Sequence, residues 1–321
     1  MYPFEVSVVL LTYNPQADNL LFTLNSILLQ QGCCYEIIIS DDGSKTTNEN
    51  VIIQRLQNVD SKHWVYLKNT PNEGTIRNYL HALNVARGKY VYGISPGDFL
   101  YDEFVIRDFY QFCEKKHAQI CFGDADYYET LPQGKVLVNG VQKSPRSPEL
   151  FEGSNLFRQK VAFMFGNFIV GPSYFRRTDI TRKYLELISQ SIKYMEDSTS
   201  TLFALADGVP VVYYPRKIVW YEYNSGISTS GNAYWINTLN EEIKTTYRLL
   251  SQEHPDDRVI DAAWTSKGAQ NKAFGIICRF IKHPIISLII LWQKIKKRHY
   301  NCATVQKQKE FQEYLDRLNK E

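Results

Sequence analysis

The chain has 321 residues, of which 44% are hydrophobic and 22% charged, and its net charge is +3. This composition is that of a folded globular protein and excludes intrinsic disorder. The N-terminus has no basic patch before an apolar stretch, so no secretory signal is predicted. The six cysteines form no C-x-x-C pair, which favours free thiols in a reducing, cytoplasmic setting.

The first hundred residues predict alternating strands and helices. Apolar runs at 6–11, 36–40, 64–67 and 90–94 predict strands, and the apolar spacing at 20–28 and the segment 75–87 predict helices. Asn14-Pro15 is expected to begin the first helix, and Gly88 to end the second. The alternation predicts an α/β fold with a mainly parallel sheet. A further strand is expected at 209–214.

Polar residues follow three of these strands. They are Thr12-Tyr13-Asn14, Asp41-Asp42 and Ser95-Pro96-Gly97-Asp98. Parallel strands end at one edge of a sheet, where ligands bind, so we expect the three groups to converge. Asp41 can accept hydrogen bonds from a nucleobase while Tyr13 stacks on it, although D-D-G-S is by itself also an ordinary turn. Asp98 can hold Mg²⁺ or Mn²⁺ together with water and a diphosphate.

A second acidic pair, Glu196-Asp197, precedes the run Ser198–Leu202. If the pair faces the crevice, one carboxylate can take a proton from an attacking hydroxyl. Its other interpretation is compensation of a helix dipole by two acids in the first turn. The six histidines have no zinc-type spacing, so oxygen ligands are expected for any metal.

Taken in order, the motifs resemble glycosyltransferase family 2. The resemblance covers about residues 4–230 and includes 6–14 (VSVVLLTYN), 41–44 (DDGS), 72–78 (NEGTIRN), 86–91 (ARGKYV), 166–169 (GNFI), 176–177 (RR), 196–197 (ED) and 221–228 (YEYNSGIS). It implies the GT-A fold and, in most members, inversion at the sugar. The donor is then expected to be a nucleotide-sugar, with UDP-sugars first.

The resemblance also implies roles for individual residues. It places Asp197 as the general base with Glu196 beside it, and Asp98 as the ligand of Mn²⁺ or Mg²⁺. The residues placed at the nucleotide-sugar are Thr12, Tyr13, Asn14, Asp41, Asp42, Arg77, Asn78, Ser95 and Asp98. The family often has several acids at 95–98, where this chain keeps only Asp98. One carboxylate can suffice, because Mg²⁺ retains waters and takes substrate phosphates as ligands.

Two units are expected. Residues 1–230 form the catalytic domain, with a nucleotide-sugar half at about 1–100 and an acceptor half at about 101–230. Residues 132–155, rich in Gly, Pro and Ser, are predicted to be a mobile lid that excludes water. Residues 231–321 form a helical, basic extension.

The extension is basic where the rest of the chain is acidic. Residues 262–309 carry ten Lys or Arg and no Asp or Glu. Because the whole chain has a net charge of +3, the rest of the chain has a net charge of −7. The apolar stretches 274–281 and 285–292 are too short to cross a bilayer. With the basic run Lys294–Arg298, they favour a helix at the interface of an anionic membrane through residues 274–300. The alternatives are packing on the catalytic domain or a dimer contact, and nucleic acid is not an expected partner.

The leading hypothesis is an inverting glycosyltransferase that extends a glycan or lipid-linked acceptor in cell-surface polysaccharide synthesis, on the inner face of the membrane. The alternative is a degenerate member that serves as a nucleotide-binding or scaffold subunit. A nicotinamide-dependent oxidoreductase is set aside, because no G-x-G-x-x-G follows the first strand. The mixed-charge segment 305–321 leaves a homo-oligomer open.

Overall fold

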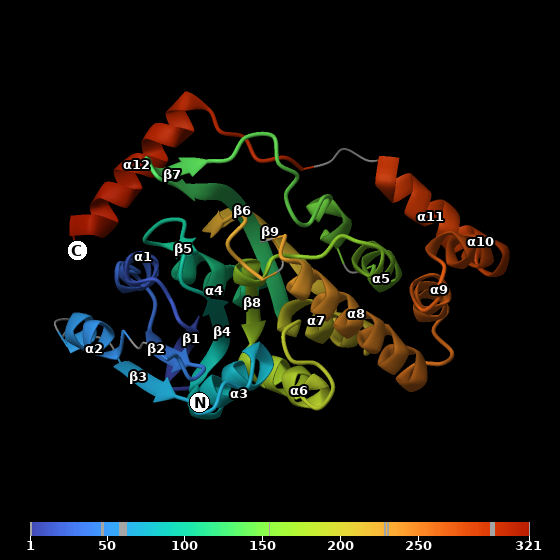
Figure 1. Cartoon of the computed structure of the whole chain (residues 1–321), viewed down its shortest axis with the longest axis horizontal. Coiled ribbons are helices and arrows are strands. Elements are labelled where there is room, and N and C mark those ends of the chain that lie inside the picture. Colours follow the sequence, from blue (N-terminus) through green and yellow to red (C-terminus); the bar gives the residue numbers. More distant parts are fainter. Residues whose placement is uncertain are drawn as a thin grey trace.

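A nine-stranded mixed sheet flanked by helices forms the body of the protein (Figure 1). The computed structural model describes residues 2–45, 48–57, 63–153, 155–227, 229, 231–295 and 299–320. The strand order is β3-β2-β1-β4-β8-β6-β9-β5, and β7 pairs with β6. The strands are β1 Phe4–Thr12, β2 Tyr35–Asp41, β3 His63–Lys68, β4 Gly88–Ile94, β5 Phe99–Leu100, β6 Ile120–Leu131, β7 Gly134–Leu137, β8 Tyr174–Arg177 and β9 Val211–Glu222.

Helices cover both faces of this sheet and continue past it toward the C-terminus. The α-helices are α1 Ala17–Leu28, α2 Glu49–Gln57, α3 Thr75–Val85, α4 Val105–Lys116, α5 Leu156–Met164, α6 Thr178–Ile188, α7 Glu196–Ala206, α8 Ala233–Glu253, α9 Arg258–Lys267, α10 Lys272–Lys282, α11 Pro284–Ile295 and α12 Val305–Lys320. Two short 3₁₀ turns, η1 Pro148–Phe151 and η2 Gly171–Ser173, lie between them.

The predicted parallel sheet is confirmed for the first four strands. β3, β2, β1 and β4 are mutually parallel, and Thr12 at the end of β1 lies in register with Asp41 at the end of β2. β1 is buried on both faces: Val8 and Leu10 belong to the hydrophobic cluster that includes α1 and α4, whereas Val9 belongs to the cluster that includes α3. The polar residues after β1 and β2 therefore meet at one edge, as expected.

The second half of the sheet is joined to the first through β8. This short strand is antiparallel to both β4 and β6. Beyond it, the two twelve-residue strands β6 and β9 run parallel to each other, with a register shift around Asp124. β9 begins inside the predicted strand 209–214 and continues well past it. This arrangement brings η2, β8 and the start of α7 next to the end of β4.

The helices after residue 231 pack on the body through buried apolar residues. Tyr247 of α8, Ile260 of α9 and Ile290 of α11 belong to the same hydrophobic cluster as α3 and α7. α12 lies across the other end of the sheet, where Phe311 packs against Phe99 (Figure 1). The apolar face of α12 is thus used within the chain, and a homo-oligomer through the segment 305–321 stays a prediction.

The stretch that leads into α12 is fastened to β6 by the buried side chain of Asn301. Its Oδ1 accepts the Tyr127 N–H at 3.0 Å, and its Nδ2 donates to the Tyr127 carbonyl at 2.8 Å and to the Val138 carbonyl. Its own backbone exchanges bonds with Gly140 and Val141. One side-chain amide therefore bonds both backbone groups of a strand residue, as a neighbouring strand would.

Three local expectations differ from the structure. α1 begins at Ala17 rather than at Pro15, because Asn14 turns the chain with a φ of 45°. α3 ends at Val85, and Gly88 is the first residue of β4 rather than a helix cap. At Gly88 a Cβ would lie 2.3 Å from the Ser7 nitrogen, so the close approach of β1 explains this glycine better than a helix end does.

In the segment predicted as a mobile lid, 132–155, the described residues, 132–153 and 155, are anchored instead. β7 pairs with β6, and the backbone of 140–146 bonds with that of 299–301. Leu150 and Phe151 of η1 lie in the hydrophobic core. The glycines, prolines and serines that suggested a loose loop thus belong to a bonded segment, whose partner near the C-terminus no local pattern reveals.

Candidate active site

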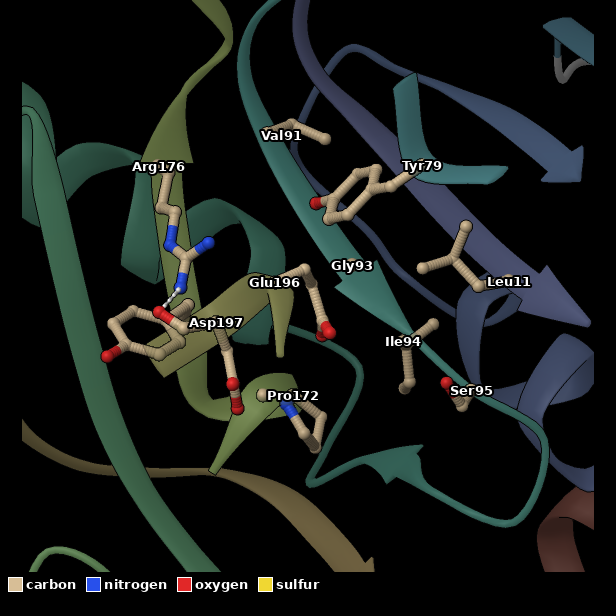
Figure 2. Close-up of a pocket in the computed structure, with 12 residues that line it drawn as sticks. Leu11, Tyr79, Val91, Gly93, Ile94, Ser95, Pro172, Arg176, Glu196 and Asp197 are labelled. Atoms are coloured by element: carbon tan, nitrogen blue, oxygen red, sulfur yellow. Dashed lines mark hydrogen bonds between the residues drawn. The ribbon is translucent and has the colours of Figure 1, made fainter. Parts of the chain in front are cut away.

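A cleft opens at the carboxyl end of β4, between the two halves of the sheet (Figure 2). Its cavity volume is about 50 Å³, less than the roughly 300–1,000 Å³ of an established small-molecule site. The end of β4, η2, β8 and the start of α7 all contribute to its wall. The lining side chains include Tyr79, Ser95, Tyr174, Arg176, Glu196 and Asp197.

The acidic pair Glu196-Asp197 lies in the first turn of α7 and faces this cleft, as expected from the sequence. Burial and the neighbouring Asp197 raise the pKa of Glu196 to about 8. Burial also raises the pKa of Asp197, against the lowering effect of Arg176. Two carboxyls this close share a proton readily. The pair can therefore accept a proton near neutral pH.

Arg176 is the cation of the cleft, and it is buried on β8. Its Nη2 donates to the Asp197 backbone carbonyl at 3.3 Å, the dashed line in Figure 2, and its Nη1 donates to the Ser200 hydroxyl at 3.3 Å. The guanidinium also lies 3.8 Å from the centre of the Tyr174 ring. The sequence singled out Arg176 only as part of a resemblance, whereas the structure places it against the acidic pair.

Glu242 of α8 holds the chain that leads into the pair. Its carboxylate accepts backbone N–H groups from Lys193 at 2.9 Å, Tyr194 at 3.1 Å and Met195 at 3.0 Å. Three bonds to one carboxylate fix the approach to α7 and thereby the direction of Glu196. Sequence reasoning missed this residue, because an acid in the middle of a long amphipathic helix has no motif around it.

Gly171 leaves the approach to the carboxylates open. A Cβ at this position would lie 3.5 Å from Asp197 Oδ2 and 3.6 Å from Glu196 Oε1. At Gly171, η2 therefore passes close to both acids without a side chain. A larger residue there would occupy the space in front of the pair.

The residues expected to contact the base lie at the edge formed by β1 and β2. Thr12 is buried, and its hydroxyl has no hydrogen-bond partner among the residues that the structure describes. Asp41 is also buried, and its Oδ1 accepts the Ser44 N–H at 2.7 Å. Tyr13 is exposed, which leaves its ring free to stack. The Asn14 backbone N–H donates to Ser44 Oγ at 2.7 Å. This edge has the groups a nucleobase needs, and the contacts themselves stay a prediction.

Asp42 and Asn78 have structural bonds that account for their burial. Asp42 accepts the Glu73 N–H at 2.9 Å and the Gly74 N–H at 2.8 Å, and so fixes the loop before α3. Asn78 accepts from Ser40 Oγ at 2.6 Å and donates to the Ser40 carbonyl at 3.0 Å, which ties α3 to β2. The structure therefore gives both side chains an internal role beside their predicted place at the donor.

Two further donor residues differ in how they meet the cleft. Arg77 is about half exposed and forms an ion pair with Glu73 at 3.6 Å. Ser95 is exposed and lines the cleft at the end of β4. Ser95 is thus in position for a ligand at this strand end, whereas Arg77 lies on the outer side of α3, away from the lining residues.

Asp98 does not join the cleft that Ser95 lines. It is buried, its Oδ1 accepts the Glu222 N–H at 2.9 Å, and burial raises its pKa well above the ordinary value. The Glu222 side chain is itself held by Thr130 and by Asn19. Within the described part of the chain, no three His, Cys, Asp or Glu side chains are grouped so as to hold a metal ion. The structure thus gives Asp98 an internal bond, its role as a metal ligand stays a prediction, and no step is assigned to a metal.

Comparison with solved structures identifies the architecture. The S. aureus TarS 1-349 structure in complex with UDP-GlcNAc superposes with a TM-score of 0.58 and 16% identity, covering 87% of this chain and 73% of TarS 1-349. The mannosyltransferase PcManGT from Pyrobaculum calidifontis, in complex with GDP-Man and Mn²⁺, gives 0.54 and 12%, covering 92% and 76%. Among curated proteins no relative is detected. At these identities the likeness concerns the fold alone.

The chain has the GT-A fold of glycosyltransferases, as its mixed sheet, its flanking helices and these structural relatives show. The sequence gives the family. The family model described as Glycosyl transferase family 2 matches residues 7–179, more than half of the chain, and the chain belongs to that family. The expected fold and family are thus confirmed. The match ends before Glu196-Asp197, so the roles of these residues rest on the cleft and on the resemblance.

Proposed function

We propose that the protein is an inverting glycosyltransferase that moves a sugar from a nucleotide-sugar to a hydroxyl of an acceptor. The observation that carries the proposal is the acidic pair in the first turn of α7, which lines the cleft at the carboxyl end of β4. The UDP-GlcNAc of TarS and the GDP-Man of PcManGT favour a nucleotide-sugar donor. We take UDP-sugars as the first donors to test.

The reaction is a single displacement. Asp197 removes the proton of the acceptor hydroxyl as its oxygen attacks the anomeric carbon, and the bond from that carbon to the diphosphate oxygen breaks with its electron pair leaving on the nucleotide. Glu196 keeps a proton near neutral pH, because its pKa lies at about 8, and so leaves Asp197 as the anionic member. Arg176 lowers the pKa of Asp197 and so favours its anionic form.

The donor is proposed to lie along the edge from Thr12 and Asp41 to Ser95. Membership of the family and the Mn²⁺ of PcManGT favour a divalent metal, Mn²⁺ or Mg²⁺, at the donor diphosphate. When bound, such an ion would neutralise charge on the leaving diphosphate. Acceptors are proposed to be glycans or lipid-linked glycans of surface polysaccharides, modified in the cytoplasm at the membrane.

The test is sugar transfer by the purified chain, with UDP-sugars and GDP-sugars as donors and with Mn²⁺, Mg²⁺ or chelator present. Asp197→Asn should lower the turnover number about 10²–10⁴-fold, the range for loss of a general base, and leave nucleotide affinity unchanged. The matched control is Asp179→Asn, which removes an acid from the first turn of α6, outside the cleft.

A second candidate is a degenerate member that binds nucleotide without transfer, and the inward direction of Asp98 favours it. Tight nucleotide binding without transfer or donor hydrolysis in any metal would establish this alternative. If no nucleotide tested binds, both the transferase and the nucleotide-binding function would be overturned. Equal turnover in Asp197→Asn and in the parent would remove the proposed base while leaving the family assignment intact.

A further inference from the structure

The pair α10–α11 exposes many apolar side chains to solvent. Among the described residues, twenty large hydrophobic side chains are exposed, and ten of them fall between residues 274 and 295. We call these ten the α10–α11 surface: Phe274, Ile276, Ile277, Phe280, Ile281, Ile285, Leu288, Leu291, Trp292 and Ile295. The concentration is far above the scattered exposure normal for a folded protein and marks an interaction site.

The opposite faces of both helices are firmly packed, so this exposure is a property of the fold. Gly275 lies so close to α9 that a Cβ would stand 2.8 Å from the Ser266 carbonyl oxygen. Buried Arg279 donates to Ser287 Oγ at 3.3 Å and ties the two helices together. Ile286 and Ile290 enter the main hydrophobic cluster on the side of α5. Each helix therefore has one face used within the protein, and α11 is apolar on both.

The periodicity of α11 shows two distinct faces. Ile286, Ser287, Ile290 and Gln293 point inward, whereas 285, 288, 292 and 295 repeat at helical spacing on the exposed side. Ile281 and Ile295 are each more than three-quarters exposed, at 78% and 76%. A helix that is apolar all round needs a second apolar neighbour. In Figure 1 α10 and α11 lie at the margin of the molecule, with nothing drawn beyond them.

The charges around this surface are basic. Lys272, Lys282 and Lys294 are exposed at the ends of the two helices. In the sequence, residues 262–309 contain no Asp or Glu, and Lys296, Lys297 and Arg298 follow α11 directly. Asp261, the last acid before this stretch, is paired with Lys282 at 2.8 Å and with His283 at 2.9 Å. The partner that complements both the charge and the apolar area is a layer with an anionic face and a hydrocarbon interior.

The lengths of α10 and α11 and the bend between them bear on how they can meet a bilayer. Of the helices described, none is both long and apolar enough to cross a bilayer alone, and α10 and α11 meet that test only together, across a bend of 119°. They have eleven and twelve residues, against about 20 for a span. Short amphipathic helices with lysines and a tryptophan at their edge suit the headgroup region, where the apolar face enters a few ångströms.

We propose that the α10–α11 surface docks the protein on an anionic lipid bilayer, with both helices lying in the interfacial plane. The proposal goes beyond the transfer reaction and does not depend on the donor site. It gives residue-level content to the membrane contact expected at 274–300, and it separates the docking faces of the helices from the faces that pack on the body.

The experiment is flotation of the full chain with two kinds of vesicle. One is phosphatidylcholine alone, and the other contains roughly one third phosphatidylglycerol, which gives a strongly anionic surface. Binding is expected with the anionic vesicles, at least tenfold weaker with the neutral ones, and weaker as salt is added. The double variant Ile281→Glu, Leu288→Glu should lose binding at least tenfold. The control is Leu187→Glu, an exposed apolar residue of α6, which should bind as the parent does.

Trp292 supplies a second readout. Its emission should shift to the blue on anionic vesicles, and Trp292→Phe should remove that shift while leaving the other tryptophans as an internal reference. Nucleotide titration on the same samples checks that each variant is folded, so failure of docking is distinguishable from failure of the donor site. Absence of vesicle binding by protein that is folded in this sense would overturn the proposal. So would a stable dimer that the double variant splits, because the surface would then join two copies.

Discussion

The Glu242 carboxylate on α8 accepts the Met195 N–H at 3.0 Å, immediately before the acidic pair begins. It also accepts the N–H groups of the two preceding residues. The position of the proposed base is thus set by a helix far along the chain. Glu242 acts through α7 and is a positioning residue.

We expect Glu242→Ala to lower the turnover number about tenfold, because misplacing a reacting group by a fraction of an ångström is costly. The negative charge of Glu242 also helps raise the pKa of Glu196. The basic limb of the pH–rate profile, where Glu196 loses its proton, should therefore move to lower pH, which a purely structural defect would not cause. Glu241→Ala is the matched control, because the carboxylate of Glu241 is exposed and pairs only with Lys244 among the ion pairs described. An unchanged profile in Glu242→Ala would contradict this role.

The raised pKa of Glu196 makes a prediction about stability. In the unfolded chain the carboxyl loses its proton near its ordinary pKa of 4.5, and in the fold near 8. The folded state therefore binds the proton more tightly, so the contribution to stability is full below pH 4.5 and is lost as pH rises toward 8. Glu196→Gln should be more stable than the parent at pH 8, by about 1–3 kcal/mol, and equal to it near pH 4. Urea unfolding at both pH values measures this, and a constant difference would refute it.

Asp98 is expected to behave as a structural acceptor. Asp98→Asn keeps an oxygen for the Glu222 N–H, so nucleotide affinity should stay within about twofold with or without Mn²⁺. Asp98→Ala leaves that buried N–H without its acceptor and should cost about 1–3 kcal/mol of stability. The measurements are calorimetric titration of UDP and thermal unfolding. A loss of metal-dependent affinity in Asp98→Asn, with unchanged melting, would instead establish Asp98 as a metal ligand.

Asp42 offers a test of the donor edge. Both of its carboxylate oxygens accept backbone N–H groups of the loop before α3. Asp42→Asn keeps only one acceptor and should lower stability by about 1–2 kcal/mol, because one buried N–H loses its partner. Nucleotide affinity should fall less than in Asp41→Asn. Parallel titrations and unfolding of both variants compare them, and the reverse order would make Asp42 the principal contact.

The parallel core could be predicted from the sequence because its signals are local. The apolar runs around Val8 and Ile38 and the helical spacing from Leu20 mark buried strands and an amphipathic helix without knowledge of their partners. The order of the motifs then led to Asp41, Ser95 and Asp197. The direction of a side chain is not local. Asp98 follows the end of β4 as expected, yet it turns to β9, whose pairing no sequence pattern specifies.

Contacts between distant segments could not be predicted from the sequence for the same reason. Glu242 meets the approach to α7 across 47 or more residues, and residues 140–146 bond with 299–301. A Gly- and Pro-rich stretch has the same composition whether it is loose or held by a remote strand. The division of α10 and α11 into a packed face and a bare face also required the position of α5 and α9.

The Asn301 side chain limits how the protein can be shortened. Removing the apolar helices is the obvious way to obtain a version that does not associate with lipid. Cutting after α9 would also delete the amide that bonds to Tyr127 and the helix that covers Phe99. The strand end that carries the Glu222 contact to Asp98 would then lose its support. A usable short form must instead splice α9 to the stretch beginning at His299, so that the last segment still closes the sheet.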